Sequence, residues 1–507
     1  MQKPQPQLRL QSSDTAMIWL TGLAFTLVHI ASSGRYGFQR DELLTYSNAL
    51  HLDWCYVVYP PLTAWLARLE LAAFGPNLIG FRLFAAIAIG LLIVLTGLTA
   101  RALGGSRTAM LVAAVAAAIQ GPIIFCGSFL SYTSFDLLWW VAVAWCVACM
   151  LRSQNPRWWL AIGAAIGLGL LSKYTMAFLV AGLLGGMILT SSRRYVRSPW
   201  FWCGVAIAAV IVLPVVIWQF QHHFVGLAWM RSIHARDLYE GSTDYFLPSQ
   251  FWRTTNPVTV PLWLAGLWFL FATPAGKPFR MLGWMYVIPL ILFFAGRGRD
   301  YYLCPAYPML LAAGAVWVEG RLASLSPRSR TVSIRTIWTS LAVGGLAYSA
   351  LVVPIAPVNS TWWRIADAAN DSFNMEMGWP ELAATVARVR DSIPATERAT
   401  TGVLAADEGQ AGAVNLFGRA YGLPGAISGM NSNWLRGYGN PPPQTVIAVG
   451  FTHDELNRIF ASCTWAASLP RPYGIVNITI GNPSEIWVCR DVRGGWPALW
   501  KHFQSYG

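Results

Sequence analysis

Long runs of apolar residues recur along the first two thirds of the chain, separated by short polar segments. An apolar run of about 20 residues can cross the hydrocarbon core of a bilayer as a helix. Eleven runs can be delimited, at residues 18–31, 80–100, 108–126, 134–151, 158–171, 175–190, 200–218, 257–273, 281–295, 303–319 and 336–353. The pattern predicts a polytopic α-helical membrane protein with about 11 transmembrane helices.

The composition supports this class of protein. Hydrophobic residues make up 55% of the 507 residues and charged residues only 12%, whereas soluble domains carry about 25% charged residues. An ordinary soluble enzyme is therefore excluded. The first run follows the polar segment 1–17 without a small-residue cleavage site, so we expect a retained first helix rather than a removed signal peptide.

The basic residues gather in alternate segments between the runs. If the N-terminus is cytoplasmic, the inner segments contain fifteen Lys and Arg residues and a single acid, Asp14; these segments are 1–17, 101–107, 152–157, 191–199, 274–280 and 320–335. Cytoplasmic loops of membrane proteins carry such an excess. The pattern predicts a multi-pass protein of the cell (inner) membrane. The net charge of +13 then reflects orientation, and we expect no nucleic-acid partner.

The tail after residue 353 differs from the rest of the chain. Its apolar runs are shorter and its charge is higher, and an odd number of spans places it outside. Periodicity predicts helices over 379–389 and 454–462 and strands over 400–405, 445–450 and 485–489. We therefore divide the chain into a transmembrane domain, residues 1–353, and a small extracytoplasmic α/β domain, residues 354–507.

Two features of this tail have alternative interpretations. The acidic pair Asp407-Glu408 follows a predicted strand, and capping or loop solvation is the more common role for such a pair than catalysis. Cys463 and Cys489 share the outer domain, where oxidation is possible. Whether they pair depends on their distance, which the sequence leaves open.

The first outer loop, about residues 34–79, contains an acidic pair directly after the first span. Ionisable side chains at a membrane are costly unless they are hydrated or used. Asp41 and Glu42 are neighbours, and on a helix neighbouring side chains point about 100° apart. One of them can enter a cavity while the other pairs or caps. Further along, Pro60-Pro61 stiffens the chain near the membrane.

Basic residues that could bind an anion occur on the same predicted side. The chain has only four lysines, and Lys173 alone lies between two apolar runs, where its insertion costs about 2.5–3.5 kcal/mol. It therefore needs an anionic partner unless it snorkels to the surface. Arg297 and Arg299 lie in a short outer loop, and the guanidinium fork suits phosphate oxygens.

Several motifs together resemble glycosyltransferase family 39, which has the GT-C fold and includes protein O-mannosyltransferases and lipid A aminoarabinose transferases. The resemblance covers roughly residues 15–350. Its motifs are Arg40-Asp41-Glu42-x-x-x-Tyr46, Tyr56-x-x-x-Pro60-Pro61-Leu62, Asp136 at the mouth of a span, Leu171-Ser-Lys173-Tyr174-Thr175, Asn256-Pro257, and Gly298-Arg299-Asp300-Tyr301-Tyr302 followed by Pro305 and Pro308. The chain departs from many relatives at Tyr59, where they carry His, Gln or Lys, and at Arg299, where Lys is frequent.

The resemblance implies an enzyme, a hexosyl- or pentosyltransferase that moves a sugar from a polyprenyl-phosphate donor to an acceptor hydroxyl on the outer face of the membrane. Asp41 is then the expected general base, with Glu42 secondary and Asp136 an auxiliary carboxylate. Lys173, Arg297 and Arg299 are expected to hold the donor phosphate. The expected substrate contacts also include Tyr301, Tyr302, Tyr59, Pro60 and Pro61.

The partners and alternatives follow from the same resemblance. The acceptor is a lipid, a glycan or a protein, and the bilayer supplies the donor. No metal site is predicted, although a divalent cation near Asp41 is compatible with the motif. The alternative function is a polytopic lipid or glycan transporter or flippase. Such a protein would usually show internal repeats or paired broken helices, and it would not require Asp41 or an outer domain.

Overall fold

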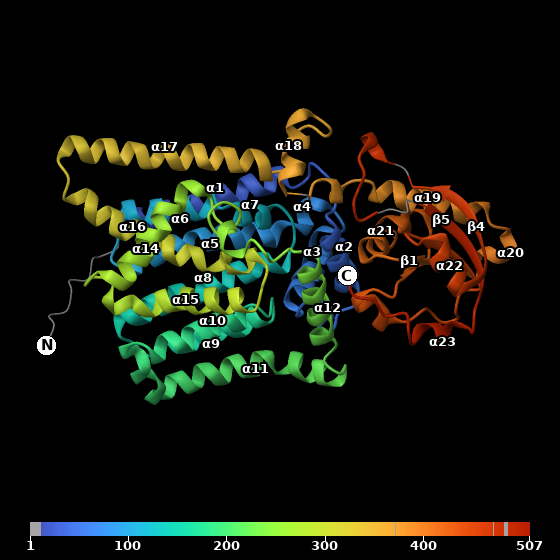
Figure 1. Cartoon of the computed structure of the whole chain (residues 1–507), viewed down its shortest axis with the longest axis horizontal. Coiled ribbons are helices and arrows are strands. Elements are labelled where there is room, and N and C mark those ends of the chain that lie inside the picture. The colour runs from blue at the N-terminus through green and yellow to red at the C-terminus, as the bar shows by residue number, and fades with distance from the viewer. Residues whose placement is uncertain (1–11, 371, 470, 481–484) are drawn as a thin grey trace.

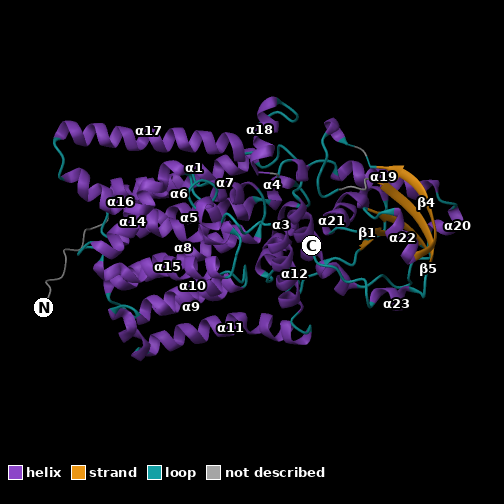
Figure 2. Cartoon of the chain, in the orientation of Figure 1, coloured by secondary structure: helices purple, strands orange, loops and turns teal. Residues whose placement is uncertain are grey.

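The computed structural model of the chain describes residues 12–370, 372–469, 471–480 and 485–507. A body of long, roughly parallel helices occupies one end of the molecule, and a smaller domain with a β-sheet occupies the other (Figures 1 and 2). Residues 1–11, part of the predicted cytoplasmic segment 1–17, lie outside the described residues.

The helical body is built from helices that match the predicted apolar runs. They are α1 (Ser12–Ser32), α5 (Leu83–Ala102), α6 (Arg107–Ala118), α7 (Gly121–Ser128), α8 (Tyr132–Ser153), α9 (Trp158–Leu170), α10 (Met176–Ile188), α11 (Pro199–Gln221), α14 (Val260–Ala272), α15 (Arg280–Ala295), α16 (Tyr307–Ala323) and α17 (Pro327–Val352). The 3₁₀ helices η1 (Ser191–Arg197), η2 (Pro257–Thr259), η3 (Lys277–Phe279) and η4 (Asp300–Ala306) lie beside their ends.

Six helices of the described chain are long and apolar enough to cross a membrane, and eight are if each bent pair counts as one span. The bent pairs are α6 with α7, at 66°, and α10 with η1, at 104°. Each of the eleven apolar runs coincides with one helix or with consecutive helices. A polytopic helical membrane fold is therefore confirmed, whereas the count of eleven spans stays a prediction.

Small residues let neighbouring helices approach closely, as is typical of helix packing in membranes. A Cβ atom on Gly163 of α9 would lie 2.1 Å from the carbonyl oxygen of Gly204 in α11. At the contact of α14 with α16, a Cβ atom on Gly266 would lie 2.1 Å from the carbonyl oxygen of Leu310. Larger residues at either glycine would force these helices apart.

Short helices cover the end of the body that faces the smaller domain. In the first outer loop they are α2 (Arg40–Leu50), α3 (Leu62–Phe74) and α4 (Leu78–Phe81), and later in the chain α12 (Val225–Tyr239) and α13 (Phe246–Ser249). Helix α2 begins with a capping box, because the Gln39 side chain accepts a hydrogen bond from the helix backbone while Glu42 accepts one from the Gln39 backbone N–H. This cap fixes the first turn of α2, which contains the acidic pair.

The smaller domain contains one five-stranded mixed sheet in the order β2-β1-β3-β5-β4. Strands β1 (Thr401–Ala405), β2 (Ala426–Ile427) and β3 (Thr445–Val449) are parallel, and β5 (Glu485–Val492) runs antiparallel to β3 and to β4 (Phe460–Ser468). Its helices are α18 (Thr361–Asn370), η5 (Asn374–Glu376), α19 (Trp379–Ser392), α20 (Ala395–Arg398), α21 (Glu408–Phe417), η6 (Gly418–Tyr421), η7 (Asn431–Arg436), α22 (His453–Ile459), η8 (Pro472–Gly474) and α23 (Trp496–Trp500).

The predicted elements of the tail are confirmed except at one place. The helix predicted over 454–462 ends at Ile459, and the chain continues directly into β4, which the sequence prediction missed. Phe460–Ser468 is strand because it pairs with β5 along its length. In that pairing Cys463 lies opposite Cys489, and the two form a disulfide with a Cα–Cα distance of 4.1 Å.

Candidate active site

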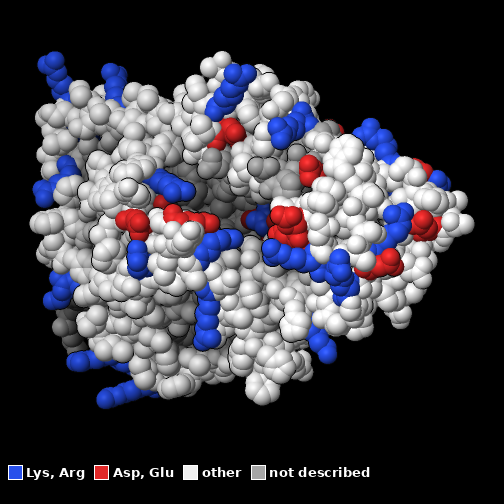
Figure 3. Space-filling view, turned by 45° about the vertical axis from the view of Figure 1, so that its right-hand side comes forward, with Lys and Arg blue, Asp and Glu red and all other residues white. Residues whose placement is uncertain are grey.

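A cavity of about 340 Å³ lies at the end of the helical body that carries the short helices. Its wall includes Lys173 and Tyr132, side chains of α12, residues 296–299 and Tyr302. The space-filling view shows the surface hollowed between the helical body and the smaller domain, with side chains of both charges around the hollow (Figure 3). A pocket of this size accommodates a small polar group with part of its carrier.

Lys173 reaches the cavity with its ammonium group surrounded by aromatic rings. The Nζ atom lies 5.3, 5.1 and 5.0 Å from the ring centres of Tyr132, Tyr301 and Tyr302, and it donates a hydrogen bond of 3.3 Å to Thr133. Its side chain is largely buried, and among the described residues no carboxylate lies within 4 Å of the ammonium. Ring faces attract a cation without neutralising it, so an anion can still bind here.

Both arginines of the following segment also line this cavity, but each is paired. Arg299 donates two hydrogen bonds, of 2.6 and 2.7 Å, to the carboxylate of Asp237 on α12 and another of 3.3 Å to the Tyr301 hydroxyl. Arg297 pairs with Asp244 at 2.7 Å and is more exposed. The structure therefore brings Lys173, Arg297 and Arg299 together around one cavity, with Lys173 alone among them lacking a carboxylate partner.

Asp41 occupies the first turn of α2. Its carboxylate makes no hydrogen bond or ion pair with another described residue, although Arg299 and Tyr132 of the cavity wall are near enough to interact with its charge. Burial raises the pKa of the Asp41 carboxyl, against the opposing effect of Arg40. A carboxylate with a raised pKa and an unused hydrogen-bonding capacity is suited to accept a proton.

Glu42 points elsewhere, into the protein. It is fully buried, receives hydrogen bonds of 2.8 and 2.7 Å from Arg82, and accepts further ones from the backbone N–H groups of Gln39 and Leu130. Glu376 of the smaller domain lies 3.3 Å from the same guanidinium. The structure thus separates the acidic pair as a helix requires: Glu42 caps and pairs, and it does not reach the cavity as a secondary catalytic acid would.

Asp136 lies behind the cavity wall. It is 1% exposed, and its Oδ2 atom accepts a hydrogen bond of 2.8 Å from Thr175, which does line the cavity. Its Oδ1 atom has no hydrogen-bond partner among the described residues. Asp136 can therefore influence the electrostatics around Lys173, but in this structure it has no direct access to the cavity.

Tyr59, Pro60 and Pro61, which precede α3, are not among the residues that line the cavity, although their neighbour Val58 is. Tyr59 is buried, its hydroxyl contacts Thr45 and Asn48, and its ring stacks on that of Tyr132 at 5.1 Å. Pro60 and Pro61 are also buried, and Pro61 precedes the first residue of α3. Tyr59 thus lies against Tyr132, which does line the cavity. A substrate contact by Tyr59, Pro60 or Pro61 stays a prediction.

The structure adds wall residues that the sequence analysis did not single out. Tyr132 sits at the start of α8, four residues before Asp136, within a segment already identified by motif. Trp229, His234 and Asp237 come from α12, which crosses beside the cavity. The pairing of Asp237 with Arg299 depends on the fold, because the two residues are 62 positions apart. No cluster of three or more His, Cys, Asp or Glu side chains suited to a metal ion occurs in the described part of the chain.

The chain is similar to several membrane glycosyltransferases. The family model described as dolichyl-phosphate-mannose-protein mannosyltransferase matches residues 58–218. The undecaprenyl phosphate-α-4-amino-4-deoxy-L-arabinose arabinosyl transferase of Pseudomonas aeruginosa (strain LESB58) is 27% identical over 66% of this chain and 65% of its own length. The lipid A galacturonosyltransferase of Rhizobium johnstonii is 28% identical over 39% of this chain and 42% of its own.

Solved structures match most of the chain. ArnT from Cupriavidus metallidurans in the apo state has a TM-score of 0.58 at 15% identity, covering 94% of this chain and 98% of that one. The archaeal oligosaccharyltransferase AglB from Archaeoglobus fulgidus has a TM-score of 0.53 at 12% identity, covering 86% and 69%. The chain therefore has the fold of the GT-C membrane glycosyltransferases. Within that class, its resemblance to family 39 is confirmed.

Proposed function

We propose that the protein is an integral membrane glycosyltransferase that moves a sugar from a polyprenyl-phosphate donor to an acceptor hydroxyl on the outer face of the membrane. The observation that carries this proposal is the Lys173 ammonium, which lies in a cavity without a carboxylate partner, in a chain of GT-C fold. A buried lysine without a carboxylate partner favours a bound anion, and the phosphate of a lipid carrier would supply one.

The donor phosphate is held by Lys173 with help from the arginines. Arg299 can share its fork between Asp237 and a phosphate oxygen, because a guanidinium has five N–H donors and only three of its hydrogen bonds are used here. Apolar side chains on one side of the cavity, among them Phe178, Leu292 and Phe293, are suited to the prenyl chain. A solved structure of ArnT from Cupriavidus metallidurans, with a TM-score of 0.52, is described as bound to undecaprenyl phosphate.

Transfer then requires one proton acceptor. The acceptor hydroxyl attacks the anomeric carbon of the sugar and its proton passes to the Asp41 carboxylate. A new carbon–oxygen bond forms to the acceptor, the bond from the anomeric carbon to the phosphate oxygen breaks, and its electron pair leaves with the lipid phosphate. Lys173 and Arg299 stabilise the charge that develops on that phosphate. Neither Glu42 nor Asp136 is assigned a step, because Glu42 is held by Arg82 and Asp136 accepts a hydrogen bond from Thr175.

We further propose the topology in which all eleven runs cross the membrane, residues 1–353 form the transmembrane domain and residues 354–507 lie outside. The basic segments 101–107, 152–157, 191–199, 274–280 and 320–335 lie at the end of the helical body farthest from the sheet (Figure 1), which supports a cytoplasmic assignment for that end. The disulfide between Cys463 and Cys489 supports an oxidising compartment for the smaller domain.

The sugar and acceptor classes are proposed from the relatives. Their names describe transfer of 4-amino-4-deoxy-arabinose, galacturonic acid and mannose, and one of them names lipid A as its target. We propose an envelope lipid or glycan as the acceptor. Asp237 is the one acid among the described residues that line the cavity, so a sugar with a positively charged group would have Asp237 as its partner there.

The proposal is tested with purified protein in lipid nanodiscs. Undecaprenyl phosphate linked to 4-amino-4-deoxy-L-arabinose and dolichyl phosphate mannose serve as donors, with lipid A as acceptor. We expect release of free lipid phosphate together with a mass increase of the acceptor. Parallel vesicle experiments measure movement of the donor between leaflets. Donor translocation without cleavage of the sugar–phosphate bond would replace the transferase proposal with the flippase alternative.

A further inference from the structure

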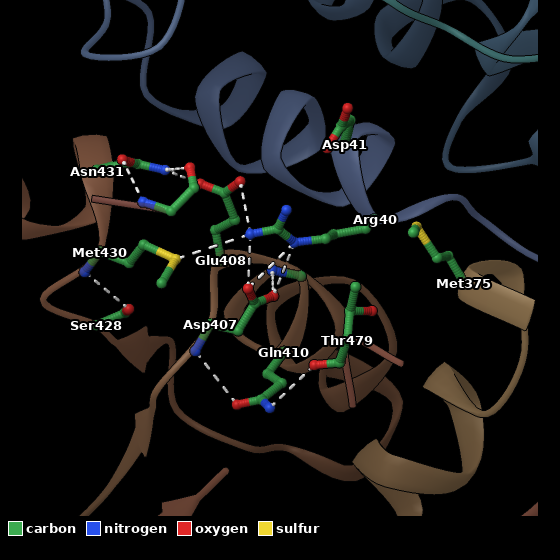
Figure 4. A network of polar contacts seen from close by, with 12 residues as sticks. Arg40, Asp41, Met375, Asp407, Glu408, Gln410, Ser428, Met430, Asn431 and Thr479 are labelled. Carbon is green, nitrogen blue, oxygen red and sulfur yellow. Dashed lines mark hydrogen bonds and ion pairs between the residues drawn. The ribbon is translucent and has the colours of Figure 1, made fainter. Parts of the chain in front are cut away.

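Arg40, the residue before Asp41, joins α2 to the smaller domain through an ion-pair cluster. Its Nη2 atom lies 2.7 Å from Oδ2 of Asp407 and 3.3 Å from Oε1 of Glu408, and its Nε atom donates to Asp407 as well. Figure 4 shows this cluster on one side of α2, with the Asp41 side chain pointing away from it. The acid proposed as base and the arginine that contacts the other domain are thus consecutive residues.

Contacts within the smaller domain orient both carboxylates independently of Arg40. Asp407 is the N-cap of α21: its side chain accepts a hydrogen bond of 2.6 Å from Gly409, and Gln410 completes a capping box. Glu408 is 2% exposed and accepts a hydrogen bond from the Asn431 side chain. Carboxylates that are already oriented lose little entropy on pairing, so this cluster forms a more rigid contact than an exposed surface pair.

The backbones of α2 and α21 also approach closely beside the cluster. A Cβ atom on Gly412 would lie 2.5 Å from the carbonyl oxygen of Leu43, and one on Gly409 would lie 2.9 Å from Cγ of Arg40. One turn further on, Asn415 donates a hydrogen bond of 3.4 Å to Ser47. Helices α2 and α21 therefore pack against each other without a gap along these residues. A displacement of one helix would displace the other.

We propose that Arg40 is a positioning residue: through Asp407 and Glu408 it clamps the helix that carries Asp41 to the smaller domain, and this contact sets the orientation of the Asp41 carboxylate. The inference rests on the proposed function. It gives the smaller domain a role in the chemistry, because a displacement of about 1 Å at a reacting group can cost about 100-fold in rate.

The pKa of the Asp41 carboxyl depends on the charges around it. It therefore distinguishes a positioning role of Arg40 from a purely structural one. The charged or titratable groups that act on it are Arg40 and Glu42 of α2, Asp407 and Glu408 of α21, Arg299 before η4, and Tyr132 of α8. Arg40 lowers the pKa of the Asp41 carboxyl and Asp407 raises it. Removing the two partners of one ion pair should therefore move the pKa of Asp41 in opposite directions.

The experiment compares Arg40→Gln, Asp407→Asn and the double variant with the wild-type chain in the nanodisc assay. Arg490→Gln is the matched control, because Arg490 pairs with Glu397 at 2.9 Å within the smaller domain and takes no part in the α2 contact. We expect both single variants to lower kcat by about 10- to 100-fold with the donor KM within about twofold. The kcat of the double variant should be no lower than that of the less active single variant. The kcat of Arg490→Gln should equal that of the wild type.

The pH dependence gives the decisive result. The acidic limb of the kcat profile should move to higher pH in Arg40→Gln and to lower pH in Asp407→Asn. If the acidic limb moved in the same direction in both variants, or moved in neither, the positioning role would be overturned. Arg40→Lys keeps the positive charge but loses the forked guanidinium group. Its acidic limb should therefore lie at the wild-type pH, while its kcat should be only partly recovered.

Two further measurements separate this inference from the proposed function and from misfolding. If Asp41→Asn keeps wild-type turnover, the proposed base is wrong. If Asp41→Asn is inactive while Arg40→Gln turns over normally, only the positioning role is wrong. Hydrogen exchange needs no substrate: Asp407→Asn should speed exchange in residues 40–46 by about tenfold and leave β1 and β3 unchanged, and an unchanged α2 would overturn the clamp.

Discussion

The ammonium of Lys173 lies 5.0 Å from the centre of the Tyr302 ring and 5.1 Å from that of Tyr301, whereas no carboxylate oxygen of the described chain lies within ion-pair distance of it. A cation that is surrounded by rings is held in place but not neutralised. The Lys173 ammonium can therefore still bind an anion favourably. The first prediction tests whether it binds the donor phosphate.

Replacing Lys173 with alanine should raise the donor KM by about 10- to 100-fold, because a charge-assisted hydrogen bond contributes about 1.5–3 kcal/mol. Lys173→Arg should recover part of the loss, since it retains the charge. The matched control is Lys277→Ala, an exposed lysine beyond the cavity wall. Donor saturation curves measure the effect. Equal KM values for Lys173→Ala and Lys277→Ala would show that the phosphate binds elsewhere.

Replacing Asp41 with asparagine should lower kcat by about 100- to 10,000-fold, the usual contribution of a general base. The donor KM should change little, because the Asp41 carboxylate does not hold the phosphate. Donor binding to the inactive variant, followed with labelled undecaprenyl phosphate, serves as the control. Wild-type turnover in Asp41→Asn would remove this residue from the mechanism.

The raised pKa of Asp41 predicts the form of the pH dependence. The base works only when it is deprotonated, so kcat/KM should fall as the pH drops through the pKa of Asp41 in the folded protein. Burial raises that pKa above the ordinary value of 3.8, so the acidic limb should lie at a higher pH than for an exposed aspartate. A profile that is flat down to pH 4 would contradict the assignment.

Glu376 should make the folded protein less stable at high pH. Burial raises the pKa of its carboxyl to about 8, with Arg82 acting in the opposite direction. The folded state therefore retains a proton that the unfolded state loses near pH 4.5, and the free energy of unfolding falls between those two pH values. Glu376→Gln should remove this dependence and be more stable than the wild type at pH 8, by roughly 2–4 kcal/mol. Unfolding temperatures measured across pH 5–8 would test it.

Removing the disulfide should destabilise the smaller domain. Cys463 and Cys489 close a loop with a sequence separation of 26, and a cross-link of that size contributes about 3 kcal/mol. The full-length double variant Cys463→Ser/Cys489→Ser should therefore unfold at a lower denaturant concentration, followed by tryptophan fluorescence. Cys203→Ser, at an exposed and unpaired cysteine, is the control and should unfold like the wild type.

The overall architecture could be predicted from the sequence because apolar length and loop charge are local properties. The same holds for Lys173, whose rarity between apolar runs signals a special environment without any knowledge of its neighbours. Two helices and three strands of the tail were predicted, whereas β2, β4 and α21 among others were not. Strand β4 follows α22 without a turn, so periodicity gave no boundary at Phe460.

The contacts that define the site could not be predicted in the same way. Arg82 and Glu376 are 294 residues apart, and Arg40 and Asp407 are 367 apart. No local pattern indicates which of several arginines will meet which acid. Tyr59 illustrates the same limit: nothing in its motif indicates that its ring stacks on that of Tyr132.

Helix α2 is held at its first turn by three different neighbours: Arg40 by the smaller domain, Asp41 beside the cavity, and Glu42 by Arg82. Since each step along a helix turns the side chain by about 100°, a slip of one residue would bring Glu42 to the cavity and Asp41 toward the carboxylates of α21. A shift of this turn by one residue would therefore break all three contacts together. Insertions or deletions in residues 39–42 cannot be absorbed gradually, so sequence change here must proceed by substitution within a fixed frame.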